Sequence, residues 1–298
     1  MNPVGLYSAK KDDLYYPCRN VTFFPLGPPR SEAALCAEIS RITYCQQEEN
    51  FAFDRDRIQK ALAPVQFTVR QFFESAGDPK HGGTHCCVAV REAGGGTDAL
   101  AVVAFRGTNK DDLSDIVDDA DILRVEWERG GKVHRGFAQA LGEVRAGLEE
   151  ARKSLACRIL FTGHSLGAAL ATLLASAWKR EAGNKDALIS FGCPRVGDAD
   201  FAATLEGMQN SRYVDCCDAV TRVPPEALGF RHFGPTLYIN RKRHVRSNPG
   251  SVSIFEDRVI AKVEYFFEYA WKSGNVGVRD LADHAPINYV LAVGSSAG

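Results

Sequence analysis

The segment TGHSLGAALATLLA, residues 162–175, contains a G-x-S-x-G pentapeptide whose central residue is Ser165. The apolar run CRILF, residues 157–161, precedes the pentapeptide and has the length of a β-strand. Small and apolar residues follow it at helical spacing to about Arg180. A strand, this pentapeptide and a helix in that order predict a nucleophile elbow, a sharp turn that presents a serine hydroxyl at the end of a sheet.

The two glycines of the pentapeptide fit this prediction. Gly163 and Gly167 leave room beside a serine in a strained turn, and the next helix directs its first N–H groups to the place where negative charge would develop. A chance match in a loop is the alternative, because the chain contains 27 glycines. The strand and the long Ala/Leu helix on either side favour the elbow.

Composition limits the classes of function. The net charge of −1 gives no reason to expect a nucleic-acid partner, and 45% hydrophobic residues are ordinary for a globular protein with a large core. At 298 residues the length allows about two domains, but a single large α/β sheet often fills such a chain. No internal repeat and no linker divides the sequence.

The cysteines and the N-terminal residues predict a cellular location. The nine cysteines are odd in number and follow no zinc spacing, and the vicinal pairs Cys86-Cys87 and Cys216-Cys217 fall in apolar runs. Buried free thiols are therefore expected, which favours a reducing compartment. No apolar segment of signal-peptide or membrane-span length stands out. We therefore predict a cytoplasmic protein, and a secreted protein whose leader was removed stays open as the alternative.

Predicted strands and helices alternate along the chain. Strand-like runs cover residues 65–73, 84–91, 100–105, 157–161, 188–191, 212–216 and 237–240. Helices are expected over 31–47, 54–62, 136–155 and 256–272, with further helices from about Asp198 and His284. This alternation predicts an α/β fold with a mainly parallel central sheet and helices on both faces. We expect one domain over 1–298, with residues 1–64 as an N-terminal arm and helices packed on its body.

A nucleophilic serine needs a base, and the base needs a carboxylate to orient it. In folds with this elbow the chain order is serine, acid, histidine, so the base is expected after Ser165. His244 lies among arginines and lysine, and His232 directly follows the candidate acid segment. His284 precedes the last predicted helix, where a loop can return over the sheet. We favour His284 and keep the other two as alternatives.

The carboxylate is expected at the end of a strand. Asp218 follows the strand-like run over 212–216 and is the preferred acid. Asp215 would lie inside that strand and is the second choice. Asp198 and Asp200 are typical of the first turn of a helix, where an acidic side chain favours the helix dipole.

Two segments could supply the oxyanion hole. The sequence His81-Gly82-Gly83-Thr84 resembles the HGGG loops of some esterases, but it precedes a strand. Phe105-Arg106-Gly107-Thr108 ends a strand, and donors are expected at the carboxyl ends of parallel strands. We therefore predict that Thr108, through its N–H and hydroxyl, acts together with the N–H of Leu166.

Several blocks together resemble the class 3 lipases, the family that includes the fungal triacylglycerol lipases. These blocks are Phe105–Thr108, Val133–Phe137, Gly163–Gly167, Gly192–Asp198, Asp218–Pro225, Leu228–His232 and Asp283-His284 with Tyr289, and they occur in the family's order between about residues 65 and 293. The resemblance implies an α/β-hydrolase fold without a cofactor or metal. It implies Ser165, Asp218 and His284 as the triad, with Thr108 and Leu166 as oxyanion donors.

The chain also departs from the family pattern. Tyr289 follows His284 at a longer spacing than the family's tyrosine, so the last helix is expected to start differently. The family's lid corresponds to residues 109–132, where six aspartates surround a few apolar residues. A lid that binds strongly to lipid surfaces would present a broader apolar face. We therefore expect short or water-soluble esters to be substrates as suitable as lipid droplets.

Other features receive plainer interpretations. The aspartate cluster lacks the glycine and glutamate of a calcium loop, and His134 and His164 are expected to make structural hydrogen bonds. The basic run of residues 241–246 is more typical of a solvated edge than of a lipid contact. A helical stripe is predicted to be core, with an acyl groove as the alternative; its members are Val263, Phe266, Phe267, Ala270 and Trp271.

The sequence therefore predicts a serine carboxylic-ester hydrolase that cleaves acylglycerols through an acyl-enzyme on Ser165. Phospholipase A1 and feruloyl-type esterase activities are the nearest alternatives, and a hydrolase-like binding module without activity is the alternative from another class. The expected partners are an ester substrate and, through the lid, a transient lipid surface. No nucleic acid is expected.

Overall fold

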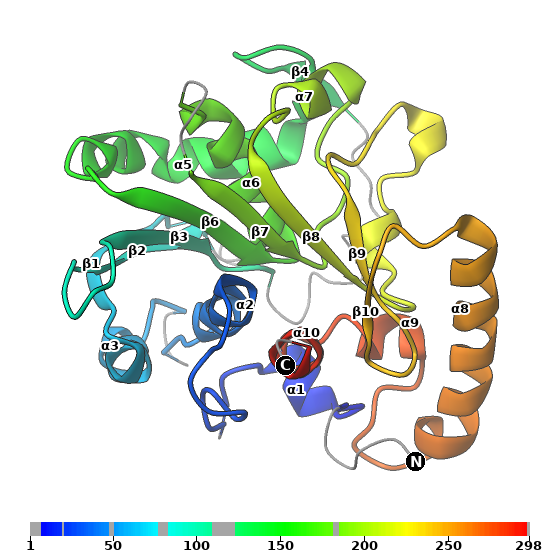
Figure 1. Ribbon diagram of the computed structural model, residues 1–298. Coiled ribbons are helices and arrows are strands. Elements are labelled where there is room, and N and C mark those ends of the chain that lie inside the picture. The colour runs from blue at the N-terminus through cyan, green and yellow to red at the C-terminus, as the bar shows by residue number, and fades with distance from the viewer. Residues whose placement is uncertain are drawn as a thin grey trace.

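The computed structural model describes residues 7–19, 21–47, 51–76, 83–108, 123–180 and 185–296. Its centre is an eight-stranded sheet in the order β1-β2-β3-β6-β7-β8-β9-β10 (Figure 1). The strands are β1 Thr68–Glu74, β2 His85–Arg91, β3 Leu100–Phe105, β6 Arg158–His164, β7 Ala187–Phe191, β8 Gln209–Asp215, β9 Thr236–Ile239 and β10 Val245–Ser247. A separate hairpin pairs β4 Arg124–Glu126 with β5 Lys132–His134.

The inner strands of the sheet run parallel. β3, β6, β7, β8 and β9 pair in parallel, whereas β1, β2 and β10 are antiparallel to their neighbours. Parallel strands bring their carboxyl ends to one edge of the sheet. The loops after β3, β6, β7 and β8 therefore meet there, and the predicted mainly parallel sheet is confirmed.

Helices cover both faces of the sheet. α5 Arg135–Arg152 and α6 Leu166–Trp178 lie on one face, and α2 Glu32–Ile42, α3 Arg55–Leu62 and α10 Pro286–Ser295 lie on the other (Figure 1). Every residue of β3 is buried; Val103 packs in the core under α5 and α6, and its neighbour Val102 packs in the opposite core. Successive side chains of a strand point to opposite faces, so a strand buried on both sides carries apolar residues throughout.

Local signals account for the helix starts. The Ser31 hydroxyl accepts a hydrogen bond from the Ala34 N–H (3.1 Å), and the Asp54 carboxylate accepts one from the Arg57 N–H (3.1 Å). The first helix of this pair ends at Ile42, earlier than predicted.

Further helical elements complete the described chain. They are the helices α1 Lys11–Tyr15, α7 Ala199–Ala203, α8 Ser251–Tyr265 and α9 Arg279–Ala282, the π-helical segment η5 Phe266–Ala270, and the 3₁₀ turns Ala63–Val65, Val220–Arg222 and Glu226–Leu228. Of the residues that the structure describes, no helix is long and apolar enough to cross a membrane.

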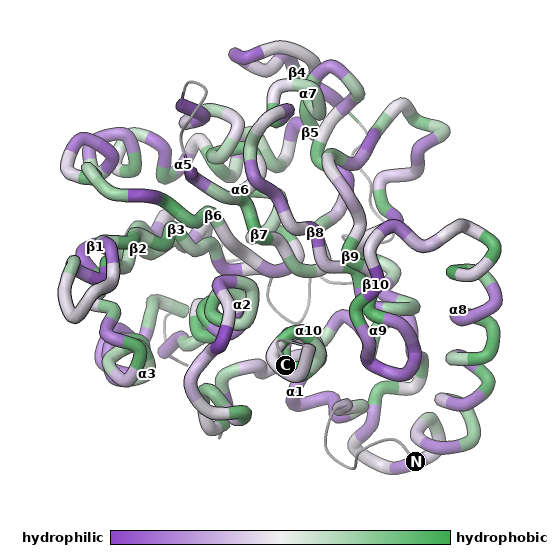
Figure 2. The backbone as a smooth tube through the Cα atoms, in the orientation of Figure 1, coloured by the Kyte–Doolittle hydropathy of each residue, from purple (hydrophilic) through white to green (hydrophobic). Residues whose placement is uncertain are grey.

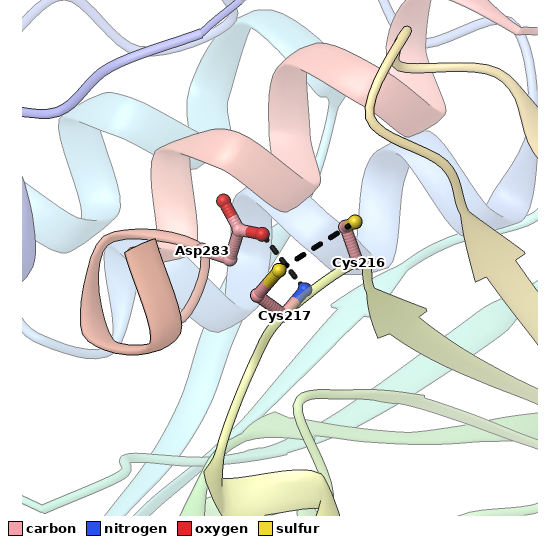
Figure 3. A group of neighbouring side chains, drawn as sticks. All are labelled: Cys216, Cys217 and Asp283. Carbon is pink, nitrogen blue, oxygen red and sulfur yellow. Dashed lines mark hydrogen bonds between the residues drawn. The ribbon is translucent and has the colours of Figure 1, made fainter. Parts of the chain in front are cut away.

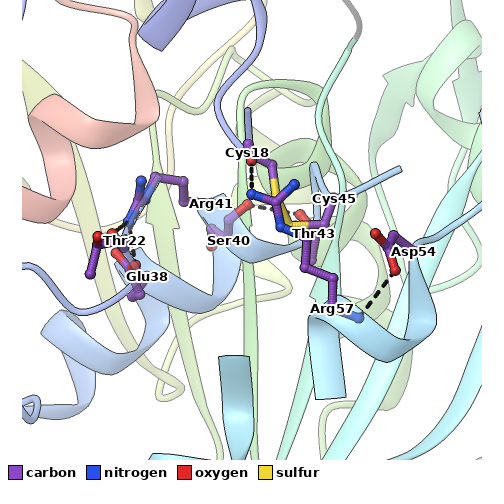
Figure 4. Close-up of a disulfide and its surroundings, with 9 residues drawn as sticks. All are labelled: Cys18, Thr22, Glu38, Ser40, Arg41, Thr43, Cys45, Asp54 and Arg57. Atoms are coloured by element: carbon purple, nitrogen blue, oxygen red, sulfur yellow. Dashed lines mark hydrogen bonds and ion pairs between the residues drawn. A yellow bond between two sulfur atoms is a disulfide. The ribbon is translucent and has the colours of Figure 1, made fainter. Parts of the chain in front are cut away.

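One disulfide corrects the expectation that all cysteines are free thiols. Cys18 and Cys45 are bonded, with their Cα atoms 5.2 Å apart, and the bond ties the N-terminal arm to the segment after α2 (Figure 4). Arg57 donates a hydrogen bond to the Cys18 carbonyl beside it. The other seven cysteines are free, and all but Cys157 are buried. The odd count hid the pair, because spacing alone does not reveal which cysteines meet.

The helical stripe predicted as core is exposed. Val263, Phe266, Phe267 and Trp271 are each more than half exposed, between 53% and 73%. Figure 2 shows hydrophobic and hydrophilic segments alternating along α8, which lies at the outer edge of the fold. Periodicity identified the helix but could not show whether another element covers its apolar side.

The predicted lid is only partly described. Residues 109–122 lie outside the described residues. Residues 123–132 contain β4 and the turn that leads to β5, and Arg135 begins α5 directly afterwards.

Candidate active site

The predicted nucleophile elbow is present between β6 and α6. Ser165 has a φ of +60°, a left-handed conformation that costs free energy for a residue with a side chain. Its N–H donates to the Phe191 carbonyl on the neighbouring strand (3.0 Å). A Cβ on Gly163 would lie 2.3 Å from the Gly167 carbonyl carbon, and one on Gly167 would lie 2.3 Å from the Phe105 carbonyl oxygen. Both glycines are therefore required by close backbone contacts.

The structure brings together three side chains that are far apart in the sequence. His284 Nε2 lies 2.9 Å from the Ser165 hydroxyl, and His284 Nδ1 lies 2.8 Å from Asp218 Oδ2. All three residues are at most 1% exposed. Since a carboxylate only accepts hydrogen bonds, Nδ1 carries the proton, and the lone pair of Nε2 faces the hydroxyl. This is the arrangement that activates a serine.

The electrostatics of the site keep Asp218 ionised. Burial opposes its charge, but the attraction of His284 and hydrogen bonds from His284 and Tyr289 outweigh burial, so the pKa of Asp218 lies below its ordinary value. The Tyr289 hydroxyl donates to Oδ2 at 2.5 Å, and the Val220 N–H donates to Oδ1 at 2.9 Å. A fixed negative charge in this position stabilises the protonated imidazole that proton transfer from the serine would create.

A second histidine, His164, is hydrogen-bonded to the backbone of the loop that carries His284. His164 Nε2 donates to the His284 carbonyl at 2.8 Å, which leaves Nδ1 to accept from the Tyr44 hydroxyl at 2.8 Å. Burial and the neighbouring His284 lower the pKa of His164 well below its ordinary value, so it stays neutral. His164 therefore has the structural hydrogen bonds that the sequence predicted for it.

Two residues of the site escaped prediction. Gly192 has a φ of +59°, and a Cβ there would lie 3.0 Å from Asp218 Oδ2 and 3.1 Å from His284 Cε1. Tyr289 was noted only for its spacing. The position of Gly192 directly after a strand was a usable signal, whereas the hydrogen bond of Tyr289 depends on how α10 packs.

The alternative residues lie in other environments. Asp215 is buried and paired with Arg243 (2.7 Å), and Asp198 caps α7 by accepting from the Phe201 N–H. His232 Nε2 donates to the Thr221 carbonyl (2.8 Å), and His244 is exposed in the turn between β9 and β10. These side chains already have partners or solvent there. Among the described residues, His284 is the histidine that lies within hydrogen-bond distance of the Ser165 hydroxyl.

The predicted oxyanion donors flank the elbow. Leu166 is the first residue of α6, where an N–H has no partner within the helix. Gly107 approaches the turn so closely that a Cβ there would lie 2.6 Å from the His164 carbonyl oxygen. The next hydroxyl, Thr108 Oγ1, is buried and has no hydrogen-bond partner among the described residues. A hydroxyl without a partner among the described residues can donate to an oxygen that binds beside the elbow.

The competing oxyanion segment is placed elsewhere. His81 and Gly82 lie outside the described residues, and Gly83-Thr84 precede β2 in the antiparallel β1–β2 connection. The Thr84 N–H donates to the Ser75 hydroxyl at 2.7 Å.

A cluster of two cysteines and an aspartate lies beside the Asp218 loop. Cys216, Cys217 and Asp283 bring their ligand atoms within 4.8 Å of one another (Figure 3). Asp283 already accepts from the Tyr7 hydroxyl (2.7 Å), the Cys217 N–H (2.8 Å) and Arg279 (3.1 Å). The hydrogen bond from Cys217 and burial raise the pKa of the Cys216 thiol. A protonated Cys216 thiol and a paired carboxylate suit loop anchoring better than metal binding.

Comparison with known proteins finds similar lipases. Residues 102–228 match the family described as lipase (class 3). The lipase of Rhizomucor miehei is 32% identical over 160 residues, covering 49% of this chain and 44% of that protein. The secreted mono- and diacylglycerol lipase 1 of Fusarium solani is 35% identical over 118 residues, covering 37% and 35%. The match thus spans less than half the length of either relative.

A solved triacylglycerol lipase, whose catalytic centre is described as a serine protease triad, superimposes with a TM-score of 0.55. It is 26% identical and covers 70% of this chain and 79% of its own. The fold and the site define an α/β-hydrolase with a serine at a nucleophile elbow. Over residues 102–228 the chain matches the class 3 lipase family.

The predicted cytoplasmic location is wrong. The relatives include proteins named as secreted lipases, from Fusarium solani and Malassezia restricta. The Cys18–Cys45 disulfide agrees with this correction, since reducing compartments disfavour such bonds. The inference failed because it read nine cysteines as nine thiols.

Proposed function

We propose that this protein is a serine carboxylic-ester hydrolase that cleaves acyl esters of glycerol. The observation that carries the proposal is the buried chain of hydrogen bonds from Asp218 through His284 to Ser165, which lies at a strained elbow. The names of the relatives support an ester of glycerol as the substrate class, since they are lipases and mono- and diacylglycerol lipases.

The reaction follows from the positions of the atoms. His284 Nε2 removes the proton of the Ser165 hydroxyl, and the serine oxygen attacks the ester carbonyl. The C–O bond to the alcohol breaks, and the imidazolium returns its proton to the leaving alcohol. Water then attacks the acyl-enzyme with His284 again as base, which releases the fatty acid and restores the serine.

The negative charge on the carbonyl oxygen needs donors that are already in place. The N–H groups of Leu166 and Thr108 and the Thr108 hydroxyl are assigned this role. Loss of one such donor typically lowers kcat by about 10²–10³-fold. Thr108→Val removes the hydroxyl and keeps the N–H, so the variant measures the contribution of the side chain alone.

Labelling with a fluorophosphonate tests the nucleophile. We expect one equivalent of label on Ser165, no label on Ser165→Ala, and slow labelling of His284→Ala. Ser190, which is also buried on a strand, supplies a matched control: Ser190→Ala is expected to label normally. A folded wild-type protein that does not label would favour the binding module.

An ester series separates lipase from esterase activity. Glycerol esters of increasing chain length are assayed below and above their solubility limit, beside a phospholipid and a feruloyl ester. A higher rate on glycerol esters supports the proposal, and a higher rate on the phospholipid or the feruloyl ester contradicts it. A rate increase at the emulsion would support transient lipid contact through residues 109–132, which belongs to this proposal.

A further inference from the structure

A continuous apolar surface runs along the outer side of α8 and η5. Six of its side chains are each at least 48% exposed and recur at helical spacing: Phe255, Val259, Val263, Phe266, Phe267 and Trp271. We call these residues the α8 outer face. Single exposed apolar side chains are common, but a contiguous patch of this kind marks an interaction site.

The inner side of the same helix is packed against the active-site loops. Ala261 and Tyr265 are buried. The Arg258 Nε donates to the Cys216 carbonyl (2.7 Å), and Arg279 Nη1 donates to the Ala261 carbonyl (3.1 Å). The helix is therefore fixed in position at the outer edge of the fold (Figure 1), and its apolar side chains are exposed. The exposure is a property of the fold and does not come from a loosely attached segment.

Positive charge borders this face. A cavity of about 170 Å³ lies between the β9–β10 hairpin and the start of α8, and Lys242, Arg246 and Ser253 are among its lining residues. Lys242 and Arg246 are exposed, and the described residues include no ion-pair partner for either side chain. Arg241, by contrast, pairs with Asp257 and Glu264.

The helix itself carries charges of both signs. Glu256 and Glu268 are exposed on it, and Lys262 is paired with Asp280. Lys272, whose Nζ lies 5.7 Å from the Trp271 ring centroid, has no ion-pair partner among the described residues. Together with Lys242 and Arg246 it outnumbers these two glutamates, so an anionic occupant is complementary. An apolar helical face with aromatic residues beside basic residues is the combination that lies in the plane of an anionic membrane surface. A second copy of this chain would bring a second set of the same cations.

We propose that the α8 outer face, together with Lys242 and Arg246, docks onto the surface of an anionic phospholipid bilayer. The phenylalanines and Trp271 enter the boundary between head groups and acyl chains, and the two cations contact lipid phosphates. The proposal concerns adsorption of the protein and does not require ester hydrolysis.

Trp271 supplies a direct spectroscopic test. Of the three tryptophans, Trp127 and Trp178 are 8% and 1% exposed, whereas Trp271 is 73% exposed. The full chain with Ser165→Ala is titrated with phosphatidylcholine vesicles, with and without phosphatidylglycerol. On the anionic vesicles we expect a blue shift of the Trp271 emission and less quenching of it by acrylamide. Both effects should be weaker on neutral vesicles and at high salt.

Cosedimentation of variants then assigns the contact. Phe267→Ser/Trp271→Ser is expected to lower the partition coefficient by about 100-fold or more, because two large apolar side chains no longer leave water. Lys242→Gln/Arg246→Gln is expected to lower it by about 10- to 30-fold on anionic vesicles only. Phe51→Ser changes a phenylalanine that is 50% exposed on another part of the chain and is expected to have no effect.

The result that overturns the proposal is equally specific. Absence of a Trp271 shift on anionic vesicles contradicts it, as does vesicle binding that the two double variants leave unchanged. A shift that needs no lipid and grows with protein concentration would mean that a second copy covers the face, and that also contradicts it. Hydrolysis of a soluble short-chain ester, assayed with Ser165 present, tests the proposed activity separately.

Discussion

The Tyr289 hydroxyl donates a hydrogen bond of 2.5 Å to Asp218 Oδ2, the same oxygen that accepts the hydrogen bond from His284 Nδ1. The same hydroxyl accepts a hydrogen bond from the Asp215 N–H at 3.1 Å. The tyrosine thereby links the last helix to the strand end that carries the carboxylate. Its longer spacing from the histidine still lets it reach the acid, because α10 passes beside β8.

Removal of this hydroxyl should weaken the orientation of the imidazole. We expect Tyr289→Phe to lower kcat about tenfold with little change in KM, since a hydrogen bond to a charged group contributes about 1.5–3 kcal/mol. The Tyr289 hydroxyl helps to lower the pKa of Asp218. Loss of the hydroxyl should therefore raise that pKa and shift the acidic limb of the pH–rate profile to higher pH. Tyr213→Phe is the control, because the Tyr213 hydroxyl has no hydrogen-bond partner among the described residues. An unchanged pH profile would contradict the positioning role.

Gly192 should tolerate no side chain. Alanine there would place a Cβ 3.0 Å from Asp218 Oδ2 and 3.1 Å from His284 Cε1, so we expect a loss of kcat/KM of about 100-fold or more. Gly207 also has a positive φ (+80°), but nothing lies within 4 Å of its Cβ position. Both alanine variants should lose about 1–2 kcal/mol of stability from backbone strain. Equal activity of the two variants would contradict the steric argument.

The ionised state of Asp218 should make stability depend on pH. Its pKa is lower in the folded protein than in the unfolded chain, so the unfolded chain binds more protons as the pH falls. The contribution of ionised Asp218 to the free energy of unfolding is complete above the ordinary pKa of about 4. It is lost as the pH falls from there through the lowered pKa of the folded state. Urea unfolding of wild type and Asp218→Asn between neutral pH and pH about 3 measures this. We expect the pH slope in the acidic range to be smaller for the variant, and parallel curves would exclude the effect.

The Cys18–Cys45 disulfide should stabilise the N-terminal arm. The two cysteines are 27 residues apart in the sequence. Closing a loop of that length lowers the chain entropy of the unfolded state, which stabilises the folded state by about 3.5 kcal/mol. Cys18→Ser/Cys45→Ser should therefore unfold at lower denaturant concentration. Reductant should lower the stability of wild type to that of the variant and leave the variant unchanged. Cys157→Ser, at the one free cysteine that is not buried, controls for loss of a thiol.

Much of the fold was readable because each signal was local or followed from chain order. The G-x-S-x-G between a strand and a helix predicted the turn at Ser165, and the serine–acid–histidine order led to Asp218 and His284. The predicted helix starts at residues 31 and 54 lie within one residue of the observed starts. These inferences needed no knowledge of which distant segments touch.

What failed depended on long-range contacts. No pattern in the sequence shows that Cys18 meets Cys45 or that Tyr289 reaches Asp218, because both depend on how separate elements pack. The stripe at Val263 and Phe267 had the spacing of a core helix, yet no described element covers it. Strands as short as β4, β5 and β10 have too few residues to show a period.

The parallel sheet also determines which part of the site should fail first. Ser165, Asp218 and the Thr108 segment each follow a strand that is hydrogen-bonded to its neighbours, whereas His284 sits on a loop between the short helix α9 and α10. Moderate heat or denaturant should therefore displace the imidazole while the sheet persists, and inactivation should precede the loss of circular dichroism. Engineering for resistance to thermal inactivation would best begin at this loop and leave the sheet unchanged.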